Sequence, residues 1–300
     1  METDGVTVAR GGKEYVQAIA EIKSLQQYYK PNVLIPASVA SRRTAFLWKQ
    51  DNLWEMQASP HSKSWDTWQH YYTYYSSLKS MGVPVTFIQE TDEFDPKEFP
   101  FMVAPAYSMV DEKIIAKWTK YIENGGHLIL SCRSGQKDNN GHFHETRLQQ
   151  PIWKLIGARV EDNDQLPPDR KGNVSFDDKN YSWNVWGELL SPETDTQALA
   201  TFSDQFYAGT SAVVTRKFGM GSVTYLGVWT TNGELEKQVL KTIYQRAGAE
   251  ILDLPNYAFV EWRDGFWVGV NYTSEPVKLP IPVNAKLLIG SREIDRKSVV

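Results

Sequence analysis

Residues 121–130 read Tyr-Ile-Glu-Asn-Gly-Gly-His-Leu-Ile-Leu, the pattern of a helix that ends and a buried strand that follows. The helix opens at Asp111, and its apolar side chains recur at helical spacing at Ile114, Ile115, Trp118 and Ile122. A glycine pair at 125–126 ends it, because glycine readily adopts the left-handed backbone found at helix C-termini. The segment therefore predicts a helix followed by a strand over residues 127–132.

The chain before this helix alternates in the same way. Two segments, 83–88 and 99–104, have the β-branched and aromatic composition of strands. An aromatic helix is expected over residues 65–81, with Gly82 at its C-terminal end. Strand–helix–strand alternation with short connections is typical of a parallel sheet with helices on both faces, so we expect an α/β fold.

The remaining segments extend this pattern at both ends. A helix is expected over 234–247, and three antiparallel strands joined by turns are expected before it, at 199–202, 212–218 and 222–229. After Pro255, short strands alternate with Asp-Gly and Pro turns, which predicts a small all-β C-terminal domain. Near the N-terminus, apolar residues at helical spacing predict a helix over 12–29.

Composition argues against several classes of protein. The formal charge of −4 over 300 residues argues against nucleic-acid binding, which usually needs a basic face. No apolar run approaches the ~18 residues of a membrane span, and no signal peptide is visible at the N-terminus. Cys132 is the single cysteine, so an intrachain disulfide is ruled out. We expect a cytoplasmic protein without membrane or nucleic-acid partners, with a periplasmic or secreted parent enzyme as the open alternative.

Several segments occur together in an order that matches one known family. They are Phe46-Leu47-Trp48, Trp54 in a polar loop, Gly82-Val83-Pro84-Val85, Phe101-Met102-Val103-Ala104-Pro105-Ala106, residues 121–130, and Gly219-Met220-Gly221-Ser222-Val223-Thr224-Tyr225-Leu226-Gly227. Their order and spacing, from about residue 13 to residue 290, resemble the middle domain of family 42 β-galactosidases.

The resemblance implies a flavodoxin-like or class I glutamine-amidotransferase-like parallel sheet over residues 31–254, a domain that mediates trimerisation in that family. It also implies a small β-domain over 255–300, and a linker helix over 1–30 that follows the catalytic barrel. A (β/α)₈ barrel needs about 250 residues, and nothing in this sequence supplies its repeated units. Because the family's two catalytic glutamates lie on that barrel, no catalytic residue is carried over.

The implied function is a non-catalytic assembly region of a β-galactosidase-type glycosidase, whose parent reaction is the hydrolysis of terminal β-galactosides. The implied partners are further copies of the chain in a homotrimer, the catalytic barrel of the parent chain, and galactosides as ligands. Two alternatives compete with this reading. One is a freestanding carbohydrate-binding protein, and the other is a cysteine-dependent hydrolase or amidotransferase-like enzyme.

The enzymatic alternative depends on Cys132. Amidotransferase-like folds place a nucleophilic cysteine at a sharp turn after a strand, and Cys132 follows a predicted strand. His142 or His144 would then act as the base. The neighbours of the cysteine, Ser131 and Arg133, are not the small residues that flank a nucleophile at such a turn. A buried thiol is therefore favoured.

Metal and cofactor binding are disfavoured by local sequence. On a strand, His142 and His144 would share one face, next to Glu145. Zinc usually needs a third or fourth protein ligand, and the residues just before form an exposed turn, so a solvated loop is favoured. The glycines of Gly219-x-Gly221 fit a hairpin turn and lack the helix that a nucleotide cradle requires. We expect no metal and no cofactor.

Aromatic residues are frequent, with 11 Trp, 15 Tyr and 12 Phe. Such side chains serve cores, subunit contacts and sugar stacking alike. The candidates for subunit contact or carbohydrate contact are two groups of tryptophans: Trp48, Trp54, Trp65 and Trp68, and then Trp183 and Trp186. Core packing and subunit contact are favoured over sugar binding. The carboxylates Glu145, Glu188 and Glu261 are expected to be solvated at the surface.

Overall fold

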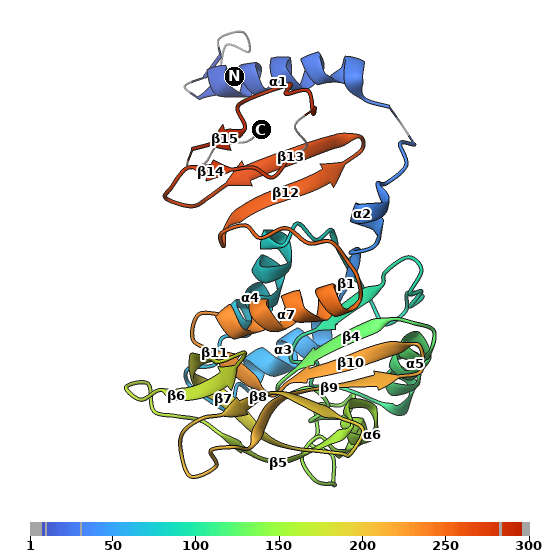
Figure 1. Cartoon of the computed structure of the whole chain (residues 1–300), viewed down its shortest axis with the longest axis vertical. Helices are drawn as coiled ribbons and strands as arrows, with labels where there is room; N and C mark the ends of the chain where they lie inside the picture. The colour runs from blue at the N-terminus through green and yellow to red at the C-terminus, as the bar shows by residue number, and fades with distance from the viewer. Residues whose placement is uncertain (1–7, 10, 31, 282–283, 296–300) are drawn as a thin grey trace. The chain divides into compact units, whose positions relative to one another are not determined.

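The computed structural model describes residues 8–9, 11–30, 32–281 and 284–295 (Figure 1). The chain forms two compact units. The larger is Ala37–Phe259, and the smaller combines the described parts of 1–36 and 260–300. The predicted domain limits, at residues 30 and 254, stay predictions.

One side of the larger unit is a parallel sheet. In spatial order its strands are β2 (Val85–Ile88), β1 (Thr44–Leu47), β3 (Phe101–Ala104), β4 (His127–Ser131) and β10 (Gly221–Leu226). Helix α5 (Glu112–Glu123) connects β3 to β4, which confirms the helix and strand predicted around residues 121–130. Glycine is required at residue 126 because an added Cβ would lie 2.3 Å from the ring of Tyr121.

The other side of the same sheet is antiparallel. β9 (Ser211–Phe218) pairs with β10, and the order continues through β8 (Gln197–Phe202), β6 (Gly172–Phe176) and β7 (Lys179–Pro192). Because β7 also pairs with β9, these four strands close into a small barrel. Two further strands pair with β7: β5 (Ala158–Asp164) and β11 (Val228–Thr230).

The prediction of a flavodoxin-like or class I glutamine-amidotransferase-like parallel sheet is therefore wrong. Among the described residues the sheet has eleven strands, and parallel pairing is limited to β2, β1, β3, β4 and β10, the last of which also pairs with β9 in antiparallel fashion. The strands expected at 199–202, 212–218 and 222–229 had no partner in the parallel sheet assigned to them. In the structure β10 pairs with β4 in parallel and with β9 in antiparallel fashion, so the barrel continues the same sheet.

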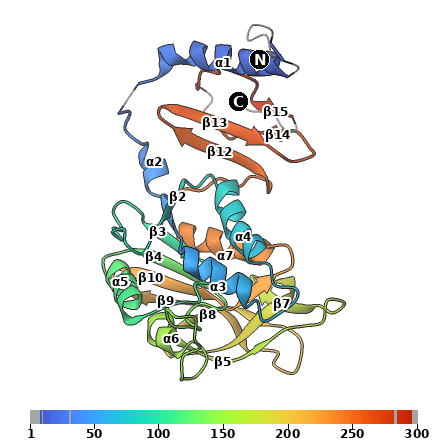
Figure 2. The same cartoon turned by 180° about the vertical axis from the view of Figure 1, so that it is seen from behind.

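Two sets of helices cover the two faces of the parallel strands (Figures 1 and 2). One face carries α3 (Gln50–Ala58), α4 (Thr67–Ser80) and α7 (Glu234–Arg246), and the other carries α5 and α6 (Gln150–Ile156). Side chains of a strand alternate between faces. Accordingly Phe46 of β1 joins the first core, while Ala45 and Leu47 join the second.

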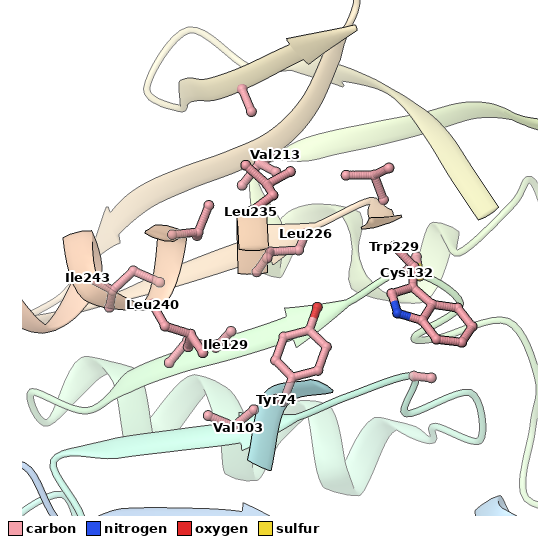
Figure 3. Packing of buried hydrophobic residues seen from close by; sticks show 14 of the residues in the cluster. Tyr74, Val103, Ile129, Cys132, Val213, Leu226, Trp229, Leu235, Leu240 and Ile243 are labelled. Carbon is pink, nitrogen blue, oxygen red and sulfur yellow. The ribbon is translucent and has the colours of Figure 1, made fainter. Parts of the chain in front are cut away.

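Figure 3 shows part of the first core, where Tyr74 of α4, Ile129 of β4 and Leu240 of α7 lie among its apolar side chains. Each fully buried side chain of this size contributes about 1.5–3 kcal/mol through removal of apolar surface from water. The helices predicted at 65–81 and 234–247 are confirmed as α4 and α7. A short helix, α2 (Ala37–Ala40), precedes β1.

The smaller unit combines an N-terminal helix with C-terminal strands. Its elements are α1 (Gly12–Leu25), a 3₁₀ turn at Gln26–Tyr28, β12 (Ala258–Arg263), β13 (Phe266–Asn271), β14 (Val277–Lys278) and β15 (Glu293–Ile294). No described residue of α1 is buried, and an apolar cavity of about 650 Å³ separates it from β13. Within the described part of the chain, no helix combines the length and apolarity needed to cross a membrane.

Candidate functional site

The carboxyl edge of the parallel strands is the first place to look for a site, because open α/β sheets bind ligands there. In this chain, side chains that follow three strands are bonded to one another. Glu90, after β2, accepts hydrogen bonds from Lys49 Nζ at 3.1 Å and from the Tyr107 hydroxyl at 2.6 Å. Lys49 Nζ also donates to Asn139 Oδ1 at 2.7 Å. The donors and acceptors of these side chains are paired with one another, so they are already occupied by hydrogen bonds within the protein.

The turn after β4 holds Cys132, the proposed nucleophile. The side chain of Cys132 is fully buried, and this burial raises the pKa of its thiol, so the thiol is protonated at neutral pH. The left-handed backbone of a nucleophile turn belongs to the next residue, Arg133, with φ of 67°. His142, on a loop, is 80% exposed. Among the described residues no hydrogen bond joins Cys132 to His142 or His144, and the nucleophile stays a prediction.

A buried polar cluster surrounds this turn, and we call it the Glu188 cluster: Glu188, Arg133, Gln149, Trp186 and Tyr225. The Glu188 carboxylate accepts hydrogen bonds from the backbone N–H of Arg133, Gln149 Nε2, Trp186 Nε1 and the Tyr225 hydroxyl, at 2.6–3.0 Å. Burial raises the pKa of Glu188, and these donors oppose that rise. The expectation that Glu188 is solvated is wrong, because its side chain is fully buried.

The Arg133 guanidinium closes the cluster on the side of α4. It donates to the carbonyl oxygens of Pro60 at 2.9 Å and Ser59 at 3.0 Å. It also lies over the rings of Trp65 and Trp186, at 4.5 and 4.9 Å from their centroids. Burial lowers the pKa of Arg133 to about 10, so the group is still a cation at neutral pH. Both rings are thereby fixed in the core by cation–π contact.

The predicted metal ligands lie on the loop before α6. The Asp138 carboxylate accepts hydrogen bonds from the backbone N–H groups of Asn140 and His142, each at 2.9 Å. His144 is half-buried, and its Nε2 atom has no hydrogen-bond partner in the described structure. No group of three metal-binding side chains comes together among the described residues. The histidine metal site therefore stays a prediction.

The six candidate tryptophans fall into two groups in the structure. Trp65, Trp183 and Trp186 are buried, and Trp183 packs edge to face with Phe202 at 5.5 Å inside the core. Trp54 and Trp68 are 60% and 54% exposed, and the half-buried Trp48 lies 5.7 Å from Trp68. The structure thus brings Trp48 and Trp68 together at the surface and places Trp54 separately on α3.

Three more aromatic residues extend the surface around Trp68, and sequence reasoning missed them as exposed groups. Phe87 on β2 is 52% exposed and lies 6.0 Å from Trp48 and 5.9 Å from Tyr75. Tyr72, one turn after Trp68 on α4, stacks with Tyr257 at 6.2 Å. The signal was available for Tyr72, from its spacing to Trp68, but not for Phe87.

We call these exposed side chains the aromatic surface: Trp68, Tyr72, Phe87 and Tyr257. β2, which carries Phe87, is the last described strand of the sheet on its side, and within the described part of the chain it pairs with β1 alone. An exposed edge strand offers unpaired backbone groups to another chain. Large aromatic side chains beside it add apolar area, which is the composition of a protein–protein contact.

Comparison with known proteins identifies the family of this chain. A family profile described as the β-galactosidase trimerisation domain matches residues 42–255. A β-galactosidase of Haloferax lucentense is 31% identical over 246 residues, which are 82% of this chain and 36% of that protein. The chain belongs to the family of β-galactosidase trimerisation domains, and the resemblance to the middle domain of family 42 β-galactosidases is confirmed.

Solved structures share the fold. The polyextremophilic β-galactosidase of the Antarctic haloarchaeon Halorubrum lacusprofundi is 25% identical, with a TM-score of 0.83 over 97% of this chain and 42% of that one. Gan42B, a GH42 β-galactosidase, is 19% identical with a TM-score of 0.78, which shows the fold alone. The chain spans little more than a third of the length of the curated relatives that it matches.

Proposed function

We propose that this chain is the non-catalytic assembly region of a β-galactosidase-type glycosidase, and that it associates with two further copies of itself. The observation that carries the proposal is the match of residues 42–255 to the β-galactosidase trimerisation domain. The catalytic barrel of the parent chain would supply the hydrolysis of terminal β-galactosides. As in the sequence-based division, residues 1–30 would link to that barrel, 31–254 would assemble the trimer, and 255–300 would form the accessory C-terminal part.

The geometry supports a non-catalytic role for the described residues. The buried carboxylates Glu188 and Glu236 are each bonded to donors inside the core and are closed to a substrate. Retaining glycosidases need two carboxyl groups about 5 Å apart on either side of an accessible sugar. Cys132 is buried and protonated, as described above. Its isolation also fits a reducing compartment, so we keep the cytoplasm as the proposed location.

We place one half of the subunit contact on the aromatic surface. A ring of three identical chains uses head-to-tail contacts, in which one surface meets a different surface of the next copy. Aromatic anchors beside an open strand edge suit such a contact, since aromatic residues dominate interface energetics. Trp54, also exposed, lies on the neighbouring helix α3 and is the second candidate for this role.

Light scattering and sedimentation of the purified chain test this proposal. The unchanged chain is expected to be a trimer at micromolar concentration, and the double variant Trp68→Ala/Phe87→Ala is expected to dissociate. Phe206→Ala is the matched control, because Phe206 is an exposed aromatic residue outside this surface. A monomeric unchanged chain would contradict self-association. If the double variant remained a trimer, the subunit contact would not lie on the aromatic surface.

A further inference from the structure

A second surface feature lies on the opposite face of the sheet and shares no residue with the aromatic surface. It is a groove of about 870 Å³ formed by α5, α6, the loop at 138–146 and the start of β5. Helices α5 and α6 lie side by side over this face (Figures 1 and 2). The volume falls within the ~300–1,000 Å³ of small-ligand sites.

A fixed aromatic ring forms part of the groove wall. Trp153, on α6, is half-buried, and its Nε1 atom donates a hydrogen bond to the Leu148 carbonyl at 2.8 Å. That bond holds the indole plane in place. The guanidinium of Arg159 on β5 lies over the ring, 5.9 Å from its centroid. The groove therefore contains a pre-positioned aromatic ring with a charged group close to it, so a ligand would not have to order the ring.

One polar atom at the groove has no partner in the protein. His144 lines the groove, and its Nε2 atom is buried without a hydrogen bond in the described structure. Its backbone N–H donates to the Gln136 carbonyl at 3.3 Å, which positions the residue. Buried polar atoms are nearly always bonded to protein or to an ordered molecule. A hydroxyl group of a ligand in the groove would satisfy this nitrogen.

The charges around the groove select the class of ligand. Four acidic and two basic residues line it: Asp111, Glu112, Asp138, Glu193, Lys154 and Arg159. The excess of carboxylates disfavours phosphates and nucleotides, while the two cations beside Trp153 disfavour a cationic ligand. Carboxylates accept and Lys and Arg donate, so a neutral molecule with many hydroxyl groups can bond to both.

Two of the acidic residues are held in place by the protein itself. Asp111 accepts from the backbone N–H of Ile114 at 2.9 Å and from Asn139 Nδ2 at 2.7 Å. Backbone N–H donors lower the pKa of Asp138, which keeps it ionised at neutral pH. These hydrogen bonds thus hold the Asp111 and Asp138 carboxylates at the rim of the groove.

We propose that the groove between α5 and α6 binds one neutral saccharide unit, with its apolar face against Trp153 and its hydroxyl groups toward His144 and the flanking carboxylates. The groove shares no lining residue with the aromatic surface. It would hold a sugar chain against this region of the protein without cleaving it.

Isothermal titration calorimetry with D-galactose and with lactose tests the proposal on the full chain. We expect saturable binding at one site per chain. Trp153→Ala should weaken binding by about tenfold or more, as loss of an aromatic anchor does, while Trp153→Phe should retain most of it. Phe206→Ala is the control, since it removes an exposed aromatic residue outside the groove, and its affinity should equal that of the unchanged chain.

Several results would overturn the proposal: no saturable heat with either sugar, equal affinity in Trp153→Ala, or competition by inorganic phosphate. If Trp153→Ala fails to fold, His144→Ala decides, because a loop substitution leaves the cores intact and should still weaken binding severalfold. Titration of the Trp68→Ala/Phe87→Ala variant separates this site from assembly. Its sugar affinity should be unchanged whatever its oligomeric state.

Discussion

Trp65 and Trp68 lie three residues apart, yet they belong to two regions of opposite character. Trp65 is buried against Arg133 and Trp186, next to the Glu188 cluster. Trp68, on α4, faces outward and forms the aromatic surface with Phe87. A tryptophan is therefore a core residue or a contact residue according to what covers it. In this chain the cover over Trp65 is a buried arginine whose own hydrogen bonds are satisfied by carbonyl groups.

Truncation of the two tryptophans should separate the regions most clearly. Trp65→Ala should lower the free energy of unfolding by about 3–5 kcal/mol, because it opens a cavity in the core and removes the ring beneath Arg133. Trp68→Ala should lower it by about 1 kcal/mol or less, since the ring is more than half exposed. Urea unfolding of both variants under conditions that keep the chain monomeric measures the difference. Equal losses would mean that the two regions do not differ as described.

Removal of the Glu188 carboxylate is the next largest effect expected. Glu188→Ala leaves four buried donors without an acceptor, which should cost about 3 kcal/mol or more. Glu188→Gln should cost less because the amide oxygen can still accept. Glu145→Ala, at an exposed position, serves as the control and should change stability by about 0.5 kcal/mol at most. If Glu188→Ala left the free energy of unfolding unchanged, the Glu188 cluster would contribute nothing to the stability of the fold.

A pH series tests a second buried carboxylate. Burial raises the pKa of Glu236 from the ordinary 4.5 to about 7, against hydrogen bonds from Thr230. The folded chain therefore prefers the protonated form. The contribution of Glu236 to the free energy of unfolding is complete below pH 4.5 and is lost as the pH rises through about 7. The total loss is up to about 3 kcal/mol.

Comparison of the unchanged chain with Glu236→Gln isolates that effect. His70, whose pKa burial lowers to about 3, changes stability in the opposite direction below pH 6.5, but it is present in both proteins. The unfolding free energy of the unchanged chain should fall relative to that of the variant between pH 5 and pH 8. Parallel curves would show that Glu236 does not titrate in this range.

The smallest effect is expected at the closed carboxyl edge of the parallel strands. Lys49→Met removes the ion pair with Glu90, which is partly open to water, so the loss should be about 1 kcal/mol or less. The Tyr107 hydroxyl continues to satisfy Glu90. Thermal unfolding of the variant measures the change. If Lys49→Met lowered stability as much as Glu188→Ala does, the ion pair at this edge would behave energetically like a buried group.

The sequence indicated the local elements around residues 83–131 well, because helix spacing, glycine stops and short apolar runs are local signals. It did not indicate which strands pair. β4 and β10 lie side by side, with His127 bonded to Ser222 although they are 95 residues apart. Apolar periodicity shows which face of a strand is buried but does not specify its neighbour. This is why a mixed sheet was interpreted as a parallel one.

The residues of the candidate site show the same contrast between what local sequence indicates and what tertiary packing decides. The sequence analysis selected Trp54 and Trp68, which are exposed. It also selected Trp65, Trp183 and Trp186, which are buried. Phe87 became part of the aromatic surface only because β2 is the edge strand. Trp153 and His144 border one groove because α6 packs beside α5 and the loop at 138–146.

By itself the sequence determined the family and many of the helices and strands, although it placed Trp54 in a polar loop where the structure has α3. The tertiary structure alone decided the mixed topology, the burial of Glu188 and the division of the tryptophans between core and surface. The physical reason is that helix and strand formation depend on neighbours within a few residues, whereas burial depends on which distant segment lies on top. For Trp65 that segment is the turn at Arg133, and over Trp68 the described structure places no such segment.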